Sequence, residues 1–213
     1  MTTDADIGNM ALSKLGTRST ITNLTENSTE ARQIAIWYAI VRDDLLRIGD
    51  WNFARVYQAL AASGTPPARW AYSYAYPSDC LKFRRIDAQI SVQAIDPAVT
   101  FEIATDGTNR MIFTNYAQAI GVYTQRVIDP NRMDPEFIVA LSTCLAAAIA
   151  LPITQKESIA NARIVEARGV VERAAADSAN EEVNNENDRL AESLQVRGFD
   201  NFSWLHSLGR VNF

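Results

Sequence analysis

The middle of the chain, residues 66–128, has a different pattern from the segments on either side of it. It begins with "TPPARWAYSYAYP", which holds three of the chain's seven prolines, and continues as short β-branched runs separated by turn residues. Long stretches with helical spacing of apolar residues precede and follow it. Because short runs bounded by turns predict strands and a period near 3.6 predicts helices, we expect a β region between two groups of helices.

Five runs in this middle region are predicted to form one small antiparallel sheet. Asp106 and Gly107 give the strongest hairpin signal, because these residue types tolerate the positive φ angles of a tight or bulged turn. The predicted strands are Leu81–Ile86, Ile90–Ile95, Val99–Ala104, Arg110–Thr114 and Ala119–Val127.

Two helices are predicted before the β region. The first runs from Asp4 to Leu15. The second runs from Ser28 to Ile48, with Asn27 as its cap and Glu30 completing a reciprocal capping box. Ile40 widens the apolar stripe that we expect this second helix to bury.

Two more helices are predicted after the β region. Asp134 is expected to cap the third helix, with Pro135 at its first position and Pro152 as its stop. Thr154 and Glu157 form a second capping box, which opens the longest helix of the chain.

Together these elements predict an α+β, mainly α fold: a helical bundle with an inserted small antiparallel β region and an extended C-terminal tail. The predicted boundaries are residues 1–65 and 130–195 for the bundle, 66–129 for the β-rich insert and 196–213 for the tail. A chain of 213 residues is long enough to bury a sizeable core without disulfides or metals.

Composition narrows the classes of partner. The net charge is −5, whereas proteins that grip duplex DNA usually carry a basic excess, so tight nucleic-acid binding is not expected. No uninterrupted apolar run reaches the ~18 residues of a membrane span, so we expect a soluble chain with no membrane partner. Cys80 and Cys144 are expected to be buried free thiols of a protein made in a reducing cytoplasm, and the pattern leaves their pairing open.

No catalytic constellation is visible in the sequence. His206 is the only histidine, and neither a nucleophile elbow nor a metal-ligand spacing accompanies it. The nine glycines contain no phosphate-binding loop. The sequence therefore predicts no catalytic, metal-binding or cofactor-binding residue and no cofactor.

Large apolar residues crowd two unusual places. Trp51, Asn52, Phe53 and Ala54 follow the second helix, and aromatic residues at such a junction are typical of a sealed corner. The end of the chain is also apolar where chains usually fray, and it must be covered by its own core or by a partner. Its large apolar residues are Phe199, Phe202, Trp204, Leu205, Leu208 and Phe213.

Three segments, in this order, resemble the tail tubular protein A family, the head-to-tail adaptors of short-tailed bacteriophages. They are "IGNMALSKLG" with "ITNLTENSTEARQIAIWYAIVRDDLLR", then "WNFARVYQALA", then "YPSDCLKFRRI". The similarity extends from Ile7 to Ile86, and Gly49 with Asp50 stands where the family has a His-Pro pair. Beyond Ile86 only the order of elements agrees.

The resemblance implies a structural virion protein without enzymatic activity, located at the head–tail junction and synthesised in the host cytoplasm. It implies a ring, expected to hold twelve copies, between the portal protein and the tail nozzle protein, lining the channel for double-stranded DNA. Twelve copies would carry a charge of about −60, which favours passage of the genome without sequence-specific binding during ejection.

The same resemblance suggests site residues. Asp106 and Gly107 are expected to face the nozzle or a neighbouring subunit, and Trp51 to Ala54 to form a structural corner. The residues expected to dock on the portal are Phe199, Phe202, Trp204, Leu205, Leu208 and Phe213. Two alternatives stay open: a small monomeric hydrolase, and an assembly chaperone or binding module.

Overall fold

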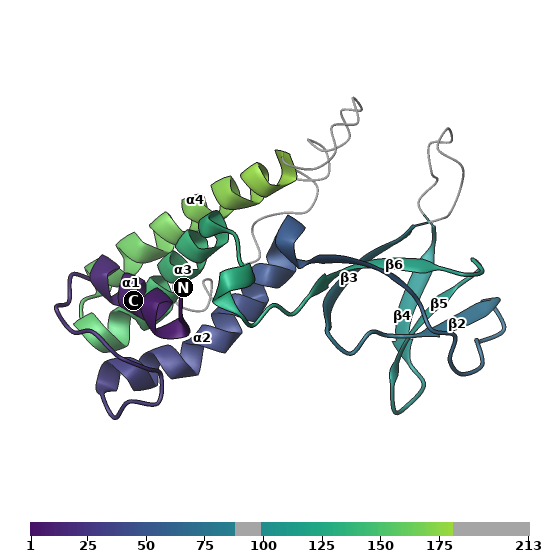
Figure 1. The fold of residues 1–213 in the computed structure, drawn as a ribbon, viewed down its shortest axis with the longest axis horizontal. Coiled ribbons are helices and arrows are strands. Elements are labelled where there is room, and N and C mark those ends of the chain that lie inside the picture. The colour runs from purple at the N-terminus through teal and green to yellow at the C-terminus, as the bar shows by residue number, and fades with distance from the viewer. Residues whose placement is uncertain (88–98, 181–213) are drawn as a thin grey trace, which may run out of the picture. The chain divides into compact units, whose positions relative to one another are not determined.

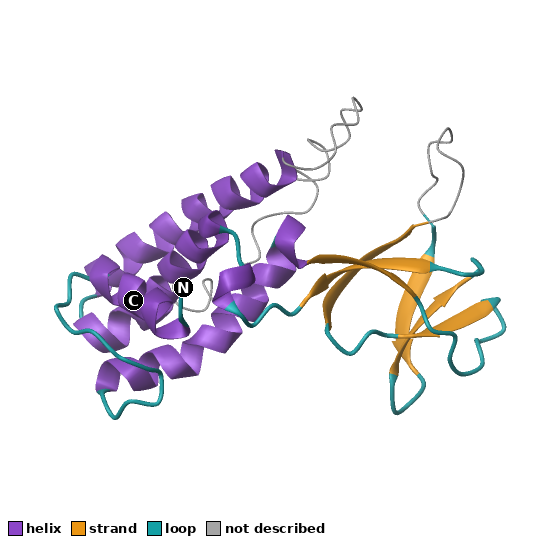
Figure 2. Ribbon diagram, in the orientation of Figure 1, coloured by secondary structure: helices purple, strands orange, loops and turns teal. Residues whose placement is uncertain are grey.

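The computed structural model describes residues 1–87 and 99–180 (Figure 1). The chain divides into two compact units. We call residues 1–53 together with the chain from Val127 onward the helical unit, and residues 54–126 the β unit. Figure 2 shows that helices build the first unit and strands build the second.

The first helix, α1 (Asp4–Lys14), begins with a capping box around Thr3. The Thr3 hydroxyl accepts a hydrogen bond from Asp6 N at 3.1 Å, and Thr3 N donates to Asp6 Oδ2 at 2.8 Å. Hydrogen bonds from the Thr3 hydroxyl and backbone to the carboxylate hold the pKa of Asp6 below its usual value. The predicted extent of this helix is confirmed to within one residue.

The second helix, α2 (Thr29–Ile48), is capped by Ser28 and not by Asn27. The Ser28 Oγ accepts from Ala31 N at 3.2 Å, whereas Asn27 Oδ1 accepts from the Arg32 guanidinium at 2.6 Å. Asparagine and serine are equally good caps, so two adjacent candidates cannot be ranked by residue type alone.

The third helix, α3 (Pro135–Thr154), is the core of the helical unit. Twelve of its twenty residues are buried, and it packs against α1, α2 and α4. By length and composition α3 is apolar enough to cross a membrane, which corrects the expectation that no segment reaches this threshold, and 67% of its apolar window is buried inside the protein. A helix that is apolar on all sides needs such cover, and its neighbours provide it here.

The end of α3 differs from the prediction. Pro152 lies inside the helix, which continues to Thr154, and Gln155 then turns the chain with a left-handed φ of 54°. The Thr154 hydroxyl donates to Ala150 O at 2.7 Å, so this residue closes α3. A proline removes one helical hydrogen bond, and the tightly packed α3 tolerates that loss in its last turn. The fourth helix, α4, spans Glu157–Asn180.

The β unit contains two three-stranded antiparallel sheets. In the first, β1 (Arg55–Ala59), β6 (Ile120–Gln125) and β3 (Cys80–Asp87) lie in the order β1-β6-β3. In the second, β2 (Tyr72–Ala75), β5 (Arg110–Thr114) and β4 (Phe101–Thr105) lie in the order β2-β5-β4. Side chains from both sheets meet in one core, whose buried members include Leu60, Tyr74, Phe83, Ile112 and Tyr123.

This architecture contradicts the predicted fold class. Of the residues that the structure describes, 48% are helical and 20% lie in strands; this part of the chain is a mixed α/β fold with two three-stranded sheets, and not a mainly helical bundle carrying one small five-stranded insert. The strands β1 and β2 were missed, because "RVYQA" and "YSYA" are too short to show a period and are held as strands by pairing with β6 and β5. The predicted strand Ile90–Ile95 lies outside the described residues.

Both cysteines are buried free thiols, as the sequence predicts. Cys144 lies in α3, where burial raises the pKa of its thiol to about 12. It therefore stays protonated and unreactive in the folded protein at neutral pH.

Candidate assembly surface

Trp51 seals one end of the helical unit. Its side chain is 1% exposed, its Nε1 donates to Leu45 O at 2.8 Å, and its ring meets that of Phe137 edge to face with centroids 4.9 Å apart. Phe53 packs on the other side of Phe137 at 5.0 Å. The sealed corner is therefore confirmed, and these rings are core and not a ligand cage. The buried Ala54 is the first residue of the β unit.

Asn52 ties the C-terminal ends of two helices together. Its backbone N donates to Ser178 Oγ at 3.3 Å, and its side-chain amide donates to Ser178 O at 2.7 Å. Ser178 lies in the last turns of α4, and Asn52 follows directly after α2. The two helices both pack against α3, and their C-terminal ends lie near each other, so they run in the same direction.

The outward side of α2 exposes large aliphatic side chains. Ile36 is 56% exposed and Ile40 is 53% exposed, so the prediction that Ile40 joins the core is wrong. At about 100° per residue, three charged residues lie with these two within an arc of about 80°. We call this set the α2 face; it consists of Arg32, Ile36, Ile40, Asp43 and Arg47.

The outward side of α4 is built in the same way. Val165 is 71% exposed, and three exposed charged residues lie with it within an arc of about 80°. We call this set the α4 face; it consists of Glu157, Val165, Arg168 and Glu172. The buried side of α4 borders this face, and its buried residues are Ile164, Ala167, Val171, Ala174 and Ala175.

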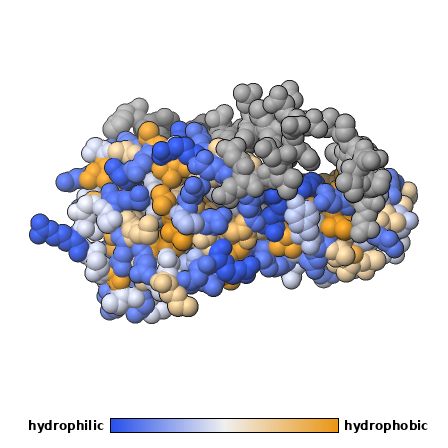
Figure 3. Space-filling view, turned by 45° about the horizontal axis from the view of Figure 1, so that its top comes forward, coloured by the Kyte–Doolittle hydropathy of each residue, from blue (hydrophilic) through white to orange (hydrophobic). Residues whose placement is uncertain are grey.

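The two faces belong to helices on either side of α3. Figure 1 shows α3 between α2 and α4, and α3 packs extensively against both. Each outer helix turns its buried side toward this core and its exposed side toward solvent. The space-filling view in Figure 3 shows apolar surface interspersed among hydrophilic residues on one side of the molecule. Isolated exposed aliphatic residues are common, whereas Ile36 and Ile40 lie one helical turn apart and form one continuous exposed aliphatic patch.

The pattern of α2 contains the signal that reveals this surface. Apolar residues occupy more than half of the helix circumference, which is wider than one core stripe requires. The pattern predicts one wide buried stripe, whereas the structure exposes Ile36 and Ile40. An apolar pattern that exceeds one face therefore indicates a second contact surface.

Asp106 and Gly107 form the exposed tip of the β4–β5 hairpin, so the predicted turn is confirmed. Gly107 has a φ of 99°, and the Asp106 carboxylate accepts from Asn109 N at 2.7 Å and Thr108 N at 2.9 Å. These bonds hold the pKa of Asp106 below its usual value. The contact of this tip with a nozzle or a neighbouring subunit stays a prediction.

The residues predicted to dock on a portal cannot be placed on the described surface. The positions that lie outside the described residues are Phe199, Phe202, Trp204, Leu205, Leu208 and Phe213, together with His206.

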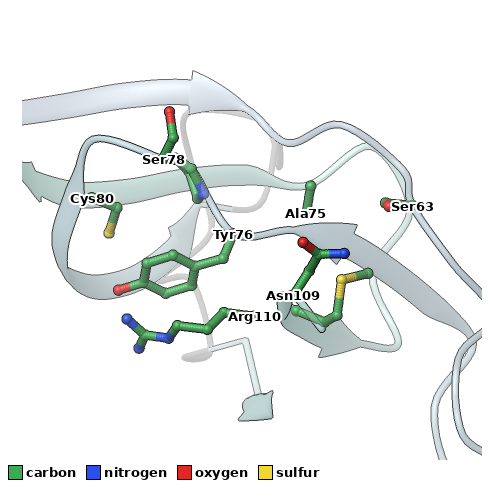
Figure 4. Close-up of a pocket in the computed structure, with 9 residues that line it drawn as sticks. Ser63, Ala75, Tyr76, Ser78, Cys80, Asn109 and Arg110 are labelled. Atoms are coloured by element: carbon green, nitrogen blue, oxygen red, sulfur yellow. The ribbon is translucent and has the colours of Figure 1, made fainter. Parts of the chain in front are cut away.

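The β unit also holds an open pocket of about 350 Å³ (Figure 4). The Arg110 guanidinium lies over the Tyr76 ring, 3.9 Å from its centroid, and Tyr76 N donates to Arg110 O at 3.2 Å. Burial, reinforced by the adjacent Cys80, raises the pKa of Tyr76 to about 12, so its phenol is neutral. The lining residues are Ser63, Ala75, Tyr76, Pro77, Ser78, Cys80, Asn109, Arg110 and Met111.

This pocket offers hydrogen-bond donors and one cation but no paired acid and base. Arg110 is the only charged residue among the nine that line it, and hydrolytic chemistry needs a base positioned beside a nucleophile. Within residues 1–87 and 99–180, no group of three or more histidine, cysteine, aspartate or glutamate side chains is placed to hold a metal ion.

Comparison with known proteins adds no family assignment. Models of known protein families give no match to the chain, and a search of curated proteins gives none either.

Proposed function

We propose that this protein is a structural adaptor of a bacteriophage virion that assembles into a ring at the head–tail junction. The observation that carries the proposal is the pair of exposed faces on α2 and α4, the two helices that flank α3. Both expose aliphatic side chains, with Ile36, Ile40 and Val165 each more than half exposed. A subunit with two separate contact surfaces is suited to repeated head-to-tail association, which closes into a ring when the rotation between copies fits.

The charge distribution supports the same role. Residues 54–126 carry seven basic and five acidic residues, whereas the rest of the chain carries thirteen basic and twenty acidic ones. The acidic excess therefore belongs to the part of the chain that contains the helical unit. A ring lined by such units repels DNA phosphates, so duplex DNA passes without being held.

The resemblance to tail tubular protein A adaptors supplies the partners in this proposal. The ring holds about twelve copies, a number taken from the resemblance and compatible with cyclic closure. Its C-terminal segment docks on the portal protein, and the Asp106–Gly107 tip reaches a nozzle protein or a neighbouring subunit. Trp51 to Phe53 act structurally, by holding the ends of α2, α3 and α4 together.

The test is the mass of the purified full-length protein alone and with the portal protein encoded by the same genome. We expect a closed oligomer or, with the portal added, a complex of defined stoichiometry. Light scattering and native mass spectrometry give both masses. A chain that stays monomeric and ignores the portal, or loses a measurable hydrolase activity on His206→Ala, would contradict the adaptor role.

A further inference from the structure

The charged residues of the two faces follow the same spacing with opposite signs. On α2 they are Arg32, Asp43 and Arg47, which reads positive, negative, positive. On α4 they are Glu157, Arg168 and Glu172, which reads negative, positive, negative. In both helices the second charge lies about 16 Å and the third about 22 Å along the axis from the first, at 1.5 Å per residue.

The two helices that carry these series are joined near their C-terminal ends. Asn52 binds Ser178, which holds the C-terminal ends of α2 and α4 near each other. Glu172 precedes Ser178 by six helical residues, or about 9 Å, and Arg47 lies one residue before the end of α2, after which a short non-helical segment leads to Asn52. Subunits related by rotation about an axis along the helices keep their levels, so opposite charges of adjacent copies would face each other.

The apolar residues fit the same alignment. Ile40 follows Arg32 by as many positions as Val165 follows Glu157, so the two exposed aliphatic side chains have the same place in the two series. Ala162 and Gly169 lie beside Val165 on α4, and a Cβ built at Gly169 would meet no atom within 4 Å. Small residues beside Val165 leave room for Ile36 and Ile40 of another copy to approach.

We infer that the occupant of the α2 face is the α4 face of a second copy of this chain, packed with its helices parallel. The inference rests on the proposed ring and names the surfaces that build it. Arg32 pairs with Glu157 of the next copy and Arg47 with Glu172, while Ile40 packs against Val165. Arg168 of the next copy approaches Asp43, whose carboxylate also accepts two hydrogen bonds from Arg42 of its own chain. The contact is heterologous, so each copy uses one face for each neighbour and the assembly propagates in one direction.

Two charge-reversed variants of the full chain test this pairing. Variant A carries Arg32→Glu and Arg47→Glu, and variant B carries Glu157→Arg and Glu172→Arg. Each alone brings like charges together, so self-association should weaken at least about tenfold by sedimentation. An equimolar mixture of A and B should assemble again, because every contact between A and B joins opposite charges.

A matched control places the same change of charge elsewhere. Arg69→Glu with Arg132→Glu reverses two exposed arginines outside both faces and should leave the mass of the assembly unchanged. If self-association of this control weakens as much as that of variant A, the effect comes from net charge. If the mixture of A and B fails to assemble, the proposed pairing is wrong.

Cross-linking distinguishes this contact from other assemblies. Ile40→Cys combined with Val165→Cys should give a ladder of disulfide-linked oligomers under mild oxidation, both alone and on the portal, whereas each single variant should not. A dimer formed by Ile40→Cys alone would indicate an α2–α2 contact. If the protein binds the portal but gives no ladder, the contact between the α2 and α4 faces is refuted and the adaptor role is not. If it gives a ladder but does not bind the portal, the contact is supported and the adaptor role is refuted.

Discussion

Position 49 needs a glycine because of a neighbouring side chain and not because of its backbone conformation. Its φ of −81° suits any residue, but a Cβ at this position would lie 2.5 Å from Cε2 of Trp51. The buried indole ring therefore occupies the space that a side chain at Gly49 would need, and the ring itself is fixed by its hydrogen bond to Leu45. Sequence analysis identified the aromatic corner but could not show this dependence, which arises from the placement of one ring.

Gly49→Ala should lower the free energy of unfolding by about 1–3 kcal/mol, because the added methyl group displaces the Trp51 ring from a packed site. Gly169→Ala, compared in the dissociated monomer, is the control, since its Cβ would meet no atom of its own chain within 4 Å. That variant should gain about 0.5–1 kcal/mol. Urea denaturation of both proteins measures the two changes, and equal effects would contradict the role of the ring.

Asp6 makes the stability of α1 depend on pH. Its folded pKa is lowered below 3.8 by hydrogen bonds with Thr3, so it contributes stability above the unfolded value that is lost as pH falls through the folded value. Asp6→Asn should therefore melt at a lower temperature than the wild type at pH 7, and this difference should shrink toward pH 3. A difference that stays constant between these pH values, measured by thermal unfolding, would exclude the carboxylate as its source.

The four helices were located from sequence with far better accuracy than the strands. Helical periodicity is carried by neighbouring residues, so α1 and α2 begin close to their predicted positions. A strand such as β1 depends on a partner that comes much later in the chain, and its own five residues carry little information. The sequence pattern did not predict that Ile36 and Ile40 are exposed on α2. Periodicity shows where the apolar residues lie on a helix, but it does not show which of them another element covers.

Ser28→Ala should destabilise the protein by about 1 kcal/mol, because it removes the side-chain acceptor for Ala31 N at the start of α2. Asn27→Ala is the comparison, since the Asn27 side chain bonds the exposed Arg32 instead of the helix backbone. Asn27→Ala should lower the stability of the protein clearly less than Ser28→Ala does, as measured by thermal unfolding of both variants. The reverse order would show that the cap lies at Asn27.

At the level of the whole chain, the proposed adaptor role assigns the C-terminal segment to a partner. Deleting residues 199–213 should abolish binding to the portal, because it removes the six large apolar residues proposed as anchors. The melting temperature should change little if these residues are covered only on the portal. Pull-down and calorimetry measure the two effects.

Replacing the same six residues by serine in the full-length chain is the control for length, and it should reproduce the loss of binding. Retained binding in either variant would refute the anchor assignment. A large drop in melting temperature would show that the segment is covered by its own chain.

The pairing of β1 with β6 has a consequence for how this protein can change. The chain enters the β unit through β1 and leaves it through β6, and Arg55 lies opposite Thr124 in their ladder. Residues paired in this way have Cα atoms about 5 Å apart. The chain therefore enters and leaves the β unit at neighbouring positions. A short turn, or another domain whose ends lie close together, could replace the β unit without changing the order of the helices. Evolution can exchange this module while the α2 and α4 surfaces stay as they are.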